Sequence, residues 1–134
     1  MTKKATMEVR AKLISTDAQK TELTLFFDAS NQIRFIYDTT VGANWSIETY
    51  DGGAPTTADS GIAADTSYHV FRIECFPVGE VHYFIDGTEC ANSPITTNIP
   101  DDAGDYLEPY LRVLTREDVA KSCDIDYVWC RQNR

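Results

Sequence analysis

Three aspartates in one loop-like stretch could bind a metal ion. Asp101, Asp102 and Asp105 lie between Pro100 and Leu107. Calcium takes six to eight oxygen ligands, and carboxylates and carbonyls of loops supply them. We therefore treat the three aspartates as a candidate calcium site, with a solvated acidic loop as the alternative. The sequence predicts no other cofactor.

Asp124 and Asp126 form an acidic pair on a predicted strand, two residues apart. Residues at i and i+2 of a strand point to the same face of the sheet. Two carboxylates on one face could share the proton transfers of a hydrolytic reaction. The alternative is an ordinary closing strand of a sheet.

Tyrosines at predicted strand ends and loops could bind a sugar. Aromatic rings stack on pyranose faces, while amides and carboxylates take the hydroxyls. Tyr50, Tyr106 and Tyr110 lie in such places, and we interpret them as a candidate glycan-binding platform. Trp45 is in phase with Ile47 and is expected in the core. The other aromatic side chains that we expect to fill the interior are Phe26, Phe35, Phe71, Phe84 and Trp129.

The four cysteines and two histidines form no zinc-binding motif, because no Cys-x-x-Cys occurs. Cys123 and Cys130 lie along one predicted strand, roughly 23 Å apart and beyond the ~7 Å limit for a disulfide. Cys75 and Cys90 could meet across neighbouring strands. We favour free, mostly buried thiols over that bridge, as in a chain folded in a reducing cytoplasm. His69 alternates with core residues, which favours a hydrogen-bonded histidine of the sheet.

Length and composition limit the protein to one acidic globular domain spanning residues 1–134. Apolar residues make up 43% and charged residues 25%, which excludes a disordered chain. The net charge of −9 argues against nucleic acid, since a phosphate binder needs a positive field. No apolar run reaches the ~18 residues of a membrane helix, and the start MTKKATMEV lacks a signal-peptide core. We expect neither a membrane nor a nucleic-acid partner.

The chain alternates between apolar and polar residues nearly everywhere, which predicts strands with one buried face. Asp86-Gly87 is the strongest hairpin signal. The stretch 115–122 could form one helical turn or a charged loop. About ten short strands without a real helix predict an antiparallel sandwich or barrel. The predicted strands are 7–13, 21–28, 33–38, 45–50, 56–60, 68–76, 81–85, 88–92, 107–114 and 125–130.

The sequence resembles the concanavalin A-like lectin and glucanase superfamily, which includes laminin-G-like domains. The likeness spans about Met7 to Trp129 and is closest to the version in phage virion proteins. It implies an all-β fold, an antiparallel jelly-roll β-sandwich of two curved sheets. The matching segments are Asn44-Trp45, Asp51-Gly52-Gly53, Tyr68-His69, Phe71-Arg72-Ile73-Glu74, Phe84-Ile85-Asp86-Gly87, Thr97-Asn98-Ile99-Pro100 and Asp124-Ile125-Asp126-Tyr127-Val128.

The resemblance also bears on the acidic residues. Its glucanase branch uses a Glu-x-Asp-x-(x)-Glu strand. After Asp124 and Asp126, a third carboxylate would fall at Val128 or Trp129 and is missing. We therefore predict no enzyme activity. Laminin-G-like domains often hold calcium with loop carboxylates, which supports the candidate site at Asp101, Asp102 and Asp105.

Domains of this superfamily usually begin with further strands before the one that starts here at Met7. Either this chain is a compact version, or an edge is left for another chain to cover. An uncovered edge invites pairing, because its N–H and C=O groups lack partners. We therefore predict oligomerisation.

These observations predict a non-catalytic binding or structural module of a virion, such as a capsid decoration or a tail or fibre component. Its partners would be protein neighbours in the particle, or copies of itself, and host glycans. It would fold in the host cytoplasm and locate to the phage particle. The alternatives are a free-standing lectin, dependent on calcium or not, and, less favoured, a reduced glycoside hydrolase.

Overall fold

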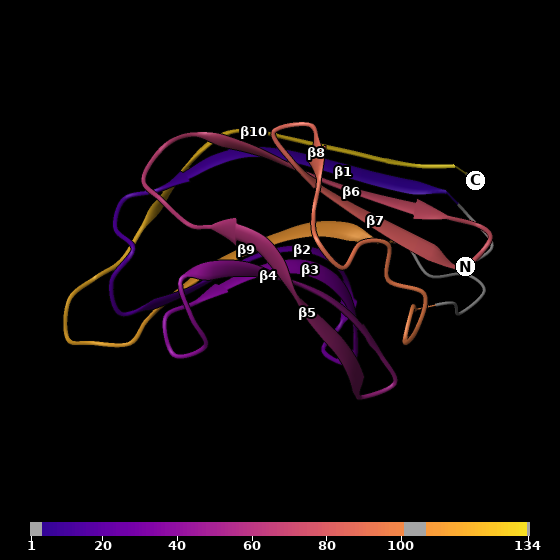
Figure 1. Cartoon of the computed structure of the whole chain (residues 1–134), viewed down its shortest axis with the longest axis horizontal. Helices are drawn as coiled ribbons and strands as arrows, with labels where there is room; N and C mark the ends of the chain where they lie inside the picture. Colours follow the sequence, from indigo (N-terminus) through magenta and orange to yellow (C-terminus); the bar gives the residue numbers. More distant parts are fainter. Residues whose placement is uncertain (1–3, 101–106, 134) are drawn as a thin grey trace.

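The computed structural model describes residues 4–100 and 107–133, and this part of the chain contains ten strands and no helix (Figure 1). Alternating apolar and polar residues favour strands, because one face can then be buried and the other hydrated. The strands are β1 Ala5–Leu13, β2 Gln19–Asp28, β3 Asn31–Asp38, β4 Asn44–Asp51, β5 Ala54–Ala63, β6 His69–Phe76, β7 Glu80–Ile85, β8 Thr88–Glu89, β9 Glu108–Thr115 and β10 Cys123–Gln132.

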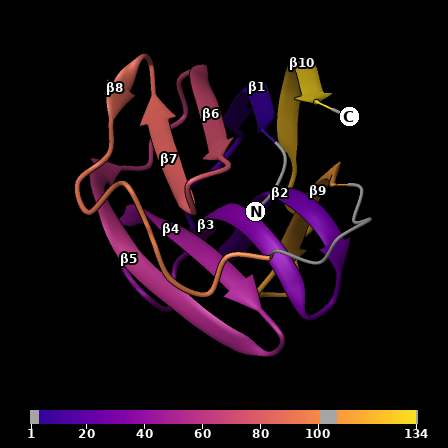
Figure 2. The same ribbon diagram turned by 90° about the vertical axis from the view of Figure 1, so that its right-hand side faces the viewer.

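The strands form two antiparallel sheets that pack face to face (Figure 2). Sheet A has the order β10-β1-β6-β7-β8, and sheet B has the order β5-β4-β3-β2-β9. Both sheets combine strands that are distant in sequence, for example β1 with β10. The predicted all-β jelly-roll sandwich is therefore confirmed.

The core lies between the sheets and is built around aromatic rings. The ring of Phe35 on β3 meets the rings of Phe71 on β6 and Tyr83 on β7, with centroids 5.3 Å away in each case. Trp45 lies 4.7 Å from Phe71 and is buried, as predicted. The hydroxyl of Tyr83 donates a 2.7 Å hydrogen bond to the carbonyl of Glu48 on the opposite sheet. This bond fixes β7 of sheet A against β4 of sheet B.

The turns follow the local sequence, with differences in length. Asp86 and Gly87 have positive φ values of 52° and 79°, as a two-residue hairpin between β7 and β8 requires. β8 is only two residues long, so the strand predicted over 88–92 is shorter than expected. β5 runs over ten residues and is longer than predicted, because β4 pairs with it along its length. The segment 115–122 holds no helix and joins β9 to β10 as a loop.

The two sheets bury their outward faces to different extents. β1 of sheet A alternates strictly between buried and half-buried residues. In β2 of sheet B, the residues from Thr21 to Leu25 are buried on both faces. In Figure 1 the strands of sheet B bow toward sheet A, so their outward face is concave and its side chains converge. We call this outward face of sheet B the concave face.

All four cysteines are free thiols, so the bridge between Cys75 and Cys90 does not form. Burial raises the pKa of Cys75 to about 12, which makes this thiol inert. Trp129 was expected in the interior but is 50% exposed, because β10 is the edge strand of sheet A and Trp129 points outward. Phe26 and Phe84 are also only half-buried, on the outward faces of the sheets. In residues 4–100 and 107–133, no helix is long and apolar enough to cross a membrane.

Candidate functional site

One row of side chains crosses all five strands of the concave face. Strand pairing places Tyr110 opposite Thr24, Thr24 opposite Arg34, Arg34 opposite Glu48, and Glu48 opposite Thr57. The row contains in order a phenol ring, a hydroxyl, a guanidinium, a carboxylate and a hydroxyl. These five groups come from positions 24 to 110 and meet only because the strands pair in this order.

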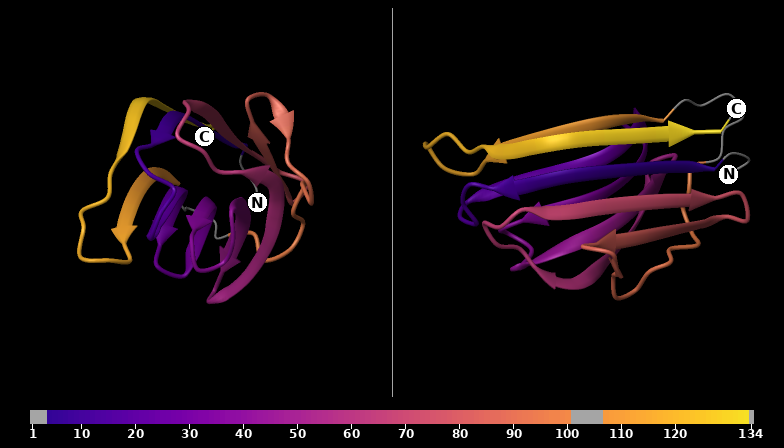
Figure 3. Two further views of the ribbon diagram at one scale, coloured as in Figure 1. Left: turned by 60° about the vertical axis from the view of Figure 1, so that its left-hand side comes forward. Right: turned by 90° about the horizontal axis from the view of Figure 1, so that it is seen from above.

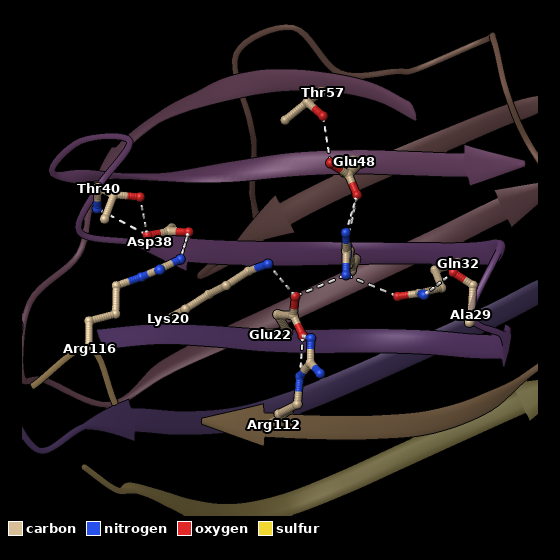
Figure 4. A network of polar contacts seen from close by, with 11 residues as sticks. Lys20, Glu22, Ala29, Gln32, Asp38, Thr40, Glu48, Thr57, Arg112 and Arg116 are labelled. Atoms are coloured by element: carbon tan, nitrogen blue, oxygen red, sulfur yellow. Dashed lines mark hydrogen bonds and ion pairs between the residues drawn. The ribbon is translucent and has the colours of Figure 1, made fainter. Parts of the chain in front are cut away.

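An ion-pair network fixes the centre of the concave face (Figure 4). Arg34 Nη1 donates to Glu22 Oε1 at 2.9 Å, and Arg34 Nε donates to Glu48 Oε1 at 2.8 Å. Arg112 Nε donates to the second oxygen of Glu22 at 2.7 Å, and Lys20 Nζ lies 2.8 Å from its first oxygen. Every oxygen of Glu22 is thus bound to a cation, which makes this side chain a rigid part of the face.

The charge of Glu22 is retained although its side chain is only 2% exposed. Burial opposes ionisation and would raise its pKa. The hydrogen bond from Lys20, the charges of Arg34 and Lys20, and the hydrogen bond from Arg112 outweigh this effect, so the pKa of Glu22 lies below its ordinary value. The carboxylate therefore acts as a fixed negative charge at the centre of the site.

The Thr24 hydroxyl is the unusual group of the row. It is buried, and it has no hydrogen-bond partner in the part of the chain that the structure describes. A buried polar atom without a partner costs about 1–3 kcal/mol, so such atoms usually mark a place for a water or a ligand. Thr24 lies directly between Tyr110 and Arg34 in the row. A ligand hydroxyl could bond to it once a neighbouring side chain of the row moves aside, because the Thr24 hydroxyl is covered in this arrangement.

Aromatic surface borders the network on the β9 side. Tyr110 is 43% exposed, and its ring centroid lies 5.1 Å from that of Phe26 on the neighbouring strand. The Phe26 ring supports the Tyr110 ring from one side, while the exposed remainder can meet a ligand. An exposed ring beside fixed polar groups is the combination that sugar-binding sites use.

A hollow of about 390 Å³ adjoins the opposite side of the face, between β4, β5 and the loop at Val41. Its polar lining includes Ser46, Thr57 and Asp59. The Thr57 hydroxyl donates to Glu48 Oε2 at 2.5 Å, and Asn44 Nδ2 donates to Asp59 at 3.1 Å. The hollow therefore connects directly to the carboxylate end of the row.

The predicted glycan platform is brought together in part. Tyr50 and Tyr110 share the concave face, since Tyr50 pairs with Gln32, and Gln32 pairs with Phe26. Two strands separate them and their rows are offset by two residues, so their backbones are roughly 16 Å apart. Tyr106, and the predicted calcium ligands Asp101, Asp102 and Asp105, lie outside the described residues. Calcium binding by these aspartates stays a prediction.

The other acidic pair lies on the outward face of sheet A. Asp124 is 3.5 Å from Lys12, and Asp126 contacts Arg10. Within residues 4–100 and 107–133, no group of three or more His, Cys, Asp or Glu side chains is arranged to hold a metal ion. His69 is hydrogen-bonded by Asp86 at 2.6 Å and Asp65 at 2.9 Å, as expected for a histidine with structural partners.

Sequence reasoning did not find the network on the concave face. Glu22, Arg34 and Glu48 each occupy the polar phase of a predicted strand, a phase that by itself predicts contact with water. One signal was available. Asp28 to Asn31 forms the turn between β2 and β3, and pairing outward from this turn brings Thr24 within one residue of Arg34; the register shift between Phe26 and Asp28 then sets the two opposite each other.

Comparisons with known proteins find solved structures of similar fold. The chain is similar to a solved structure described as a native glycosidic hydrolase, at 18% identity and a TM-score of 0.70, covering 92% of this chain and 62% of that one. It is similar to a beta-1,3-glucanase from Mycobacterium marinum, at 15% identity and a TM-score of 0.68, with 95% and 62% covered. A carbohydrate-binding module, CBM66 from Bacillus subtilis, matches at 11% identity and a TM-score of 0.63, with 95% and 74% covered.

The chain thus spans less than two thirds of the length of the two glycosidase structures. No family model and no curated protein matches the sequence. At these identities the likeness establishes the fold alone, which is a jelly-roll β-sandwich.

The prediction that the chain is not an enzyme is contradicted by the structures with a similar fold, which are described as a glycosidic hydrolase, a putative beta-glucanase and a beta-1,3-glucanase. The prediction relied on one strand motif read from the sequence. Carboxylates on different strands, such as Glu22 and Glu48, escape a search of that kind.

Proposed function

We propose that this domain binds a carbohydrate on the concave face of sheet B. The observation that carries the proposal is the buried Thr24 hydroxyl without a partner among the described residues, set between the exposed Tyr110 ring and the Arg34 guanidinium. A sugar offers an apolar ring face to Tyr110 and hydroxyl groups to Thr24 and to the polar row.

The rigidity of the site supports the same proposal. The ion pairs of Arg34 with Glu22 and Glu48 hold the polar groups in place before a ligand arrives. Groups that are already ordered lose little conformational freedom on binding, which favours affinity for a weakly interacting ligand. The names of the similar structures, a carbohydrate-binding module and a beta-1,3-glucanase, agree with this ligand class.

Calorimetric titration with soluble β-1,3-glucan oligosaccharides, and with a panel of other oligosaccharides, tests the proposal. Thr24→Val should weaken binding about fivefold to tenfold, because a hydrogen bond to the ligand is lost. Its folding stability should stay equal or rise, since the substitution removes a buried unpaired hydroxyl. A variant that binds as tightly as the wild type would contradict the role of Thr24.

Tyr110→Ala should weaken binding about threefold to tenfold through loss of ring stacking. Tyr127→Ala is the matched control, because Tyr127 is similarly exposed but lies on sheet A. If both variants weaken binding equally, the sugar does not bind on the concave face. If no oligosaccharide in the panel binds, the proposal fails.

Hydrolysis of the bound glycan is the second candidate function. It is favoured by Glu22 and Glu48, two carboxylates that approach one guanidinium from strands on either side of β3. Glycoside hydrolysis uses two such groups, one ionised and one protonated. The lowered pKa of Glu22 suits the ionised role, and Glu48 is the second carboxylate of the pair.

Release of reducing sugar from β-1,3-glucan measures this activity. Glu48→Gln should abolish it and leave binding within a few-fold of the wild type. An unsubstituted domain that binds glucan without releasing sugar would exclude hydrolysis and retain binding.

The predicted place of the domain in a phage particle, beside protein neighbours, stays a prediction. A carbohydrate-binding face is compatible with that place and does not require it.

A further inference from the structure

The β10 edge of sheet A carries an unusual concentration of exposed apolar side chains. β10 is the last strand of its sheet, and it extends over ten residues with β1 on one side only (Figure 3). Ile125 and Val128 share the inward face with core residues, since Val128 pairs with the fully buried Val9. They are nevertheless 38% and 39% exposed. Tyr127 and Trp129 are exposed on the same strand.

The other three edges of the sandwich each carry a feature that limits pairing with a further strand. β8, at the far edge of sheet A, has only two residues. β5 carries Pro55, and the segment after β8 bonds to it, with the amide of Ala91 donating to Ser60 O at 2.9 Å. β9 contains Pro109, which cannot donate to a further strand. Short strands, prolines and covering loops are the devices that prevent edge pairing. β10, which reads CDIDYVWCRQ, has no proline.

The charges of β10 also favour pairing with another copy. Its two aspartates form ion pairs with cations of the neighbouring strand β1, since Lys12 lies beside Asp124 and Arg10 beside Asp126. Their negative charges therefore repel a second copy less strongly. Arg131 is exposed and forms no ion pair with the residues that the structure describes. Antiparallel pairing of two β10 strands about Val128, with the extra residue Asp126 left unpaired in each copy, sets Arg131 of each copy opposite Asp124 of the other. Both residues lie on the outward face, so two symmetric opposite-charge pairs would form.

The same register aligns the inward side chains. The register shift between Arg10 and Ala11 places an extra residue in β10, so Ile125 and Cys130 share the inward face although their numbers differ in parity. Pairing then sets Ile125 of one copy opposite Cys130 of the other. The exposed Ile125 and Val128 side chains would be covered by the second copy, which closes the core at this edge.

We propose that β10 is the interface of a two-fold symmetric homodimer, in which two copies pair their β10 strands and join their A sheets into one. The interface is isologous, because each copy contributes the same strand. It lies on sheet A and is separate from the concave face, so it neither requires nor excludes the proposed glycan binding.

Sedimentation velocity of the full chain from about 1 to about 100 µM tests the proposal and should show a monomer–dimer equilibrium. The two tryptophans give a second readout. Trp45 is buried in either state, whereas Trp129 should shift its emission to the blue as the concentration rises. A monomer throughout this range overturns the proposal.

Exchange of charges tests the register. Arg131→Asp should weaken dimerisation about tenfold or more, because it sets aspartate against aspartate at both pairs. Asp124→Arg should do the same with two arginines. An equimolar mixture of the two variants should restore the dimer, since the opposite charges then match at both positions.

Arg72→Asp is the control, because Arg72 lies on the outward face of sheet A but on β6. It should leave the dimer unchanged. The thermal midpoint of each variant shows that it is folded. If Arg131→Asp and Asp124→Arg both dimerise like the wild type, the interface lies elsewhere and the proposal is overturned.

Discussion

Both sheets carry carboxylates and cations on the faces that point away from the core, but the two sets differ in exposure. On the concave face, Glu22 is 2% exposed and contacts three cations. On the outward face of sheet A, Asp126 is 49% exposed, and Arg10 is its one ion-pair partner among the described residues. The curvature of sheet B accounts for the difference, because side chains on a concave surface converge and exclude water from one another.

The difference predicts unequal energetic roles. Exposed ion pairs contribute little, since water screens them and long side chains lose freedom on pairing. A buried pair contributes little net attraction, but removal of one partner leaves the other charge unpaired and is costly. The concave face should therefore be sensitive to substitution, and the outward face of sheet A should be tolerant.

The largest effect is expected for Arg34→Met, which leaves Glu22 and Glu48 facing an uncharged side chain. We expect a loss of about 3–5 kcal/mol in the free energy of unfolding, measured by urea denaturation. Arg10→Met on sheet A is the matched control and should cost less than about 1 kcal/mol. Equal losses in both variants would remove the contrast between the faces.

Acid should destabilise the folded protein mainly by protonating carboxylates of sheet B, such as Glu22. The pKa of Glu22 is lower in the folded protein than in the unfolded chain, so the folded state is stabilised above the unfolded pKa of about 4.3. This stabilisation is lost as the pH falls through the folded pKa. The pKa of Asp38 is lowered in the same direction: burial opposes ionisation, but hydrogen bonds from Thr40 and Arg116 outweigh it.

We therefore expect the free energy of unfolding to decrease between about pH 5 and about pH 2, and to decrease less in Glu22→Gln. A Glu22→Gln profile parallel to that of the wild type would show that the carboxylate gains nothing from its cations.

A smaller pH effect of opposite sign is expected at His69, at the end of β6. Burial lowers the pKa of this imidazole, but the hydrogen bonds and charges of Asp86 and Asp65 outweigh burial and raise it. The resulting stabilisation is full below the unfolded pKa of about 6.5 and is lost as the pH rises through the folded pKa. The thermal midpoint of the wild type should exceed that of His69→Gln at about pH 6, and the gap should narrow by about pH 9. A constant gap would contradict the assignment.

The smallest effect is expected for Glu74→Gln at neutral pH. Glu74 lies 3.0 Å from Arg72 on the outward face of sheet A, and both side chains reach solvent. The free energy of unfolding should change by less than about 1 kcal/mol. A loss as large as that of Arg34→Met would mean that burial does not separate the two faces.

Alternation and turn residues in the sequence were sufficient to predict most strands, but not to predict which strands lie at an edge or which residues are buried. The alternation in β1, β6 and β7 and the Asp86-Gly87 turn predicted strands and a hairpin close to those observed. Trp129 alternates like an interior residue and is exposed, because periodicity does not reveal that a strand lies at an edge. β5 was predicted too short, because its small polar residues form a strand only by pairing with β4.

The sequence by itself determined an acidic all-β domain of two sheets, since alternation with period two needs only near neighbours along the chain. Tertiary structure decided which polar residues became a site. Arg34 on β3 contacts Glu22 and Glu48 because β3 lies between β2 and β4 in the sheet. Arg112 joins this network from β9, the neighbour of β2 on its other side. The bowing of sheet B then buried them, and the end of sheet A at β10 left Val128 exposed. Strand order and curvature arise from contacts between distant segments, and these contacts determine the environment of each polar side chain.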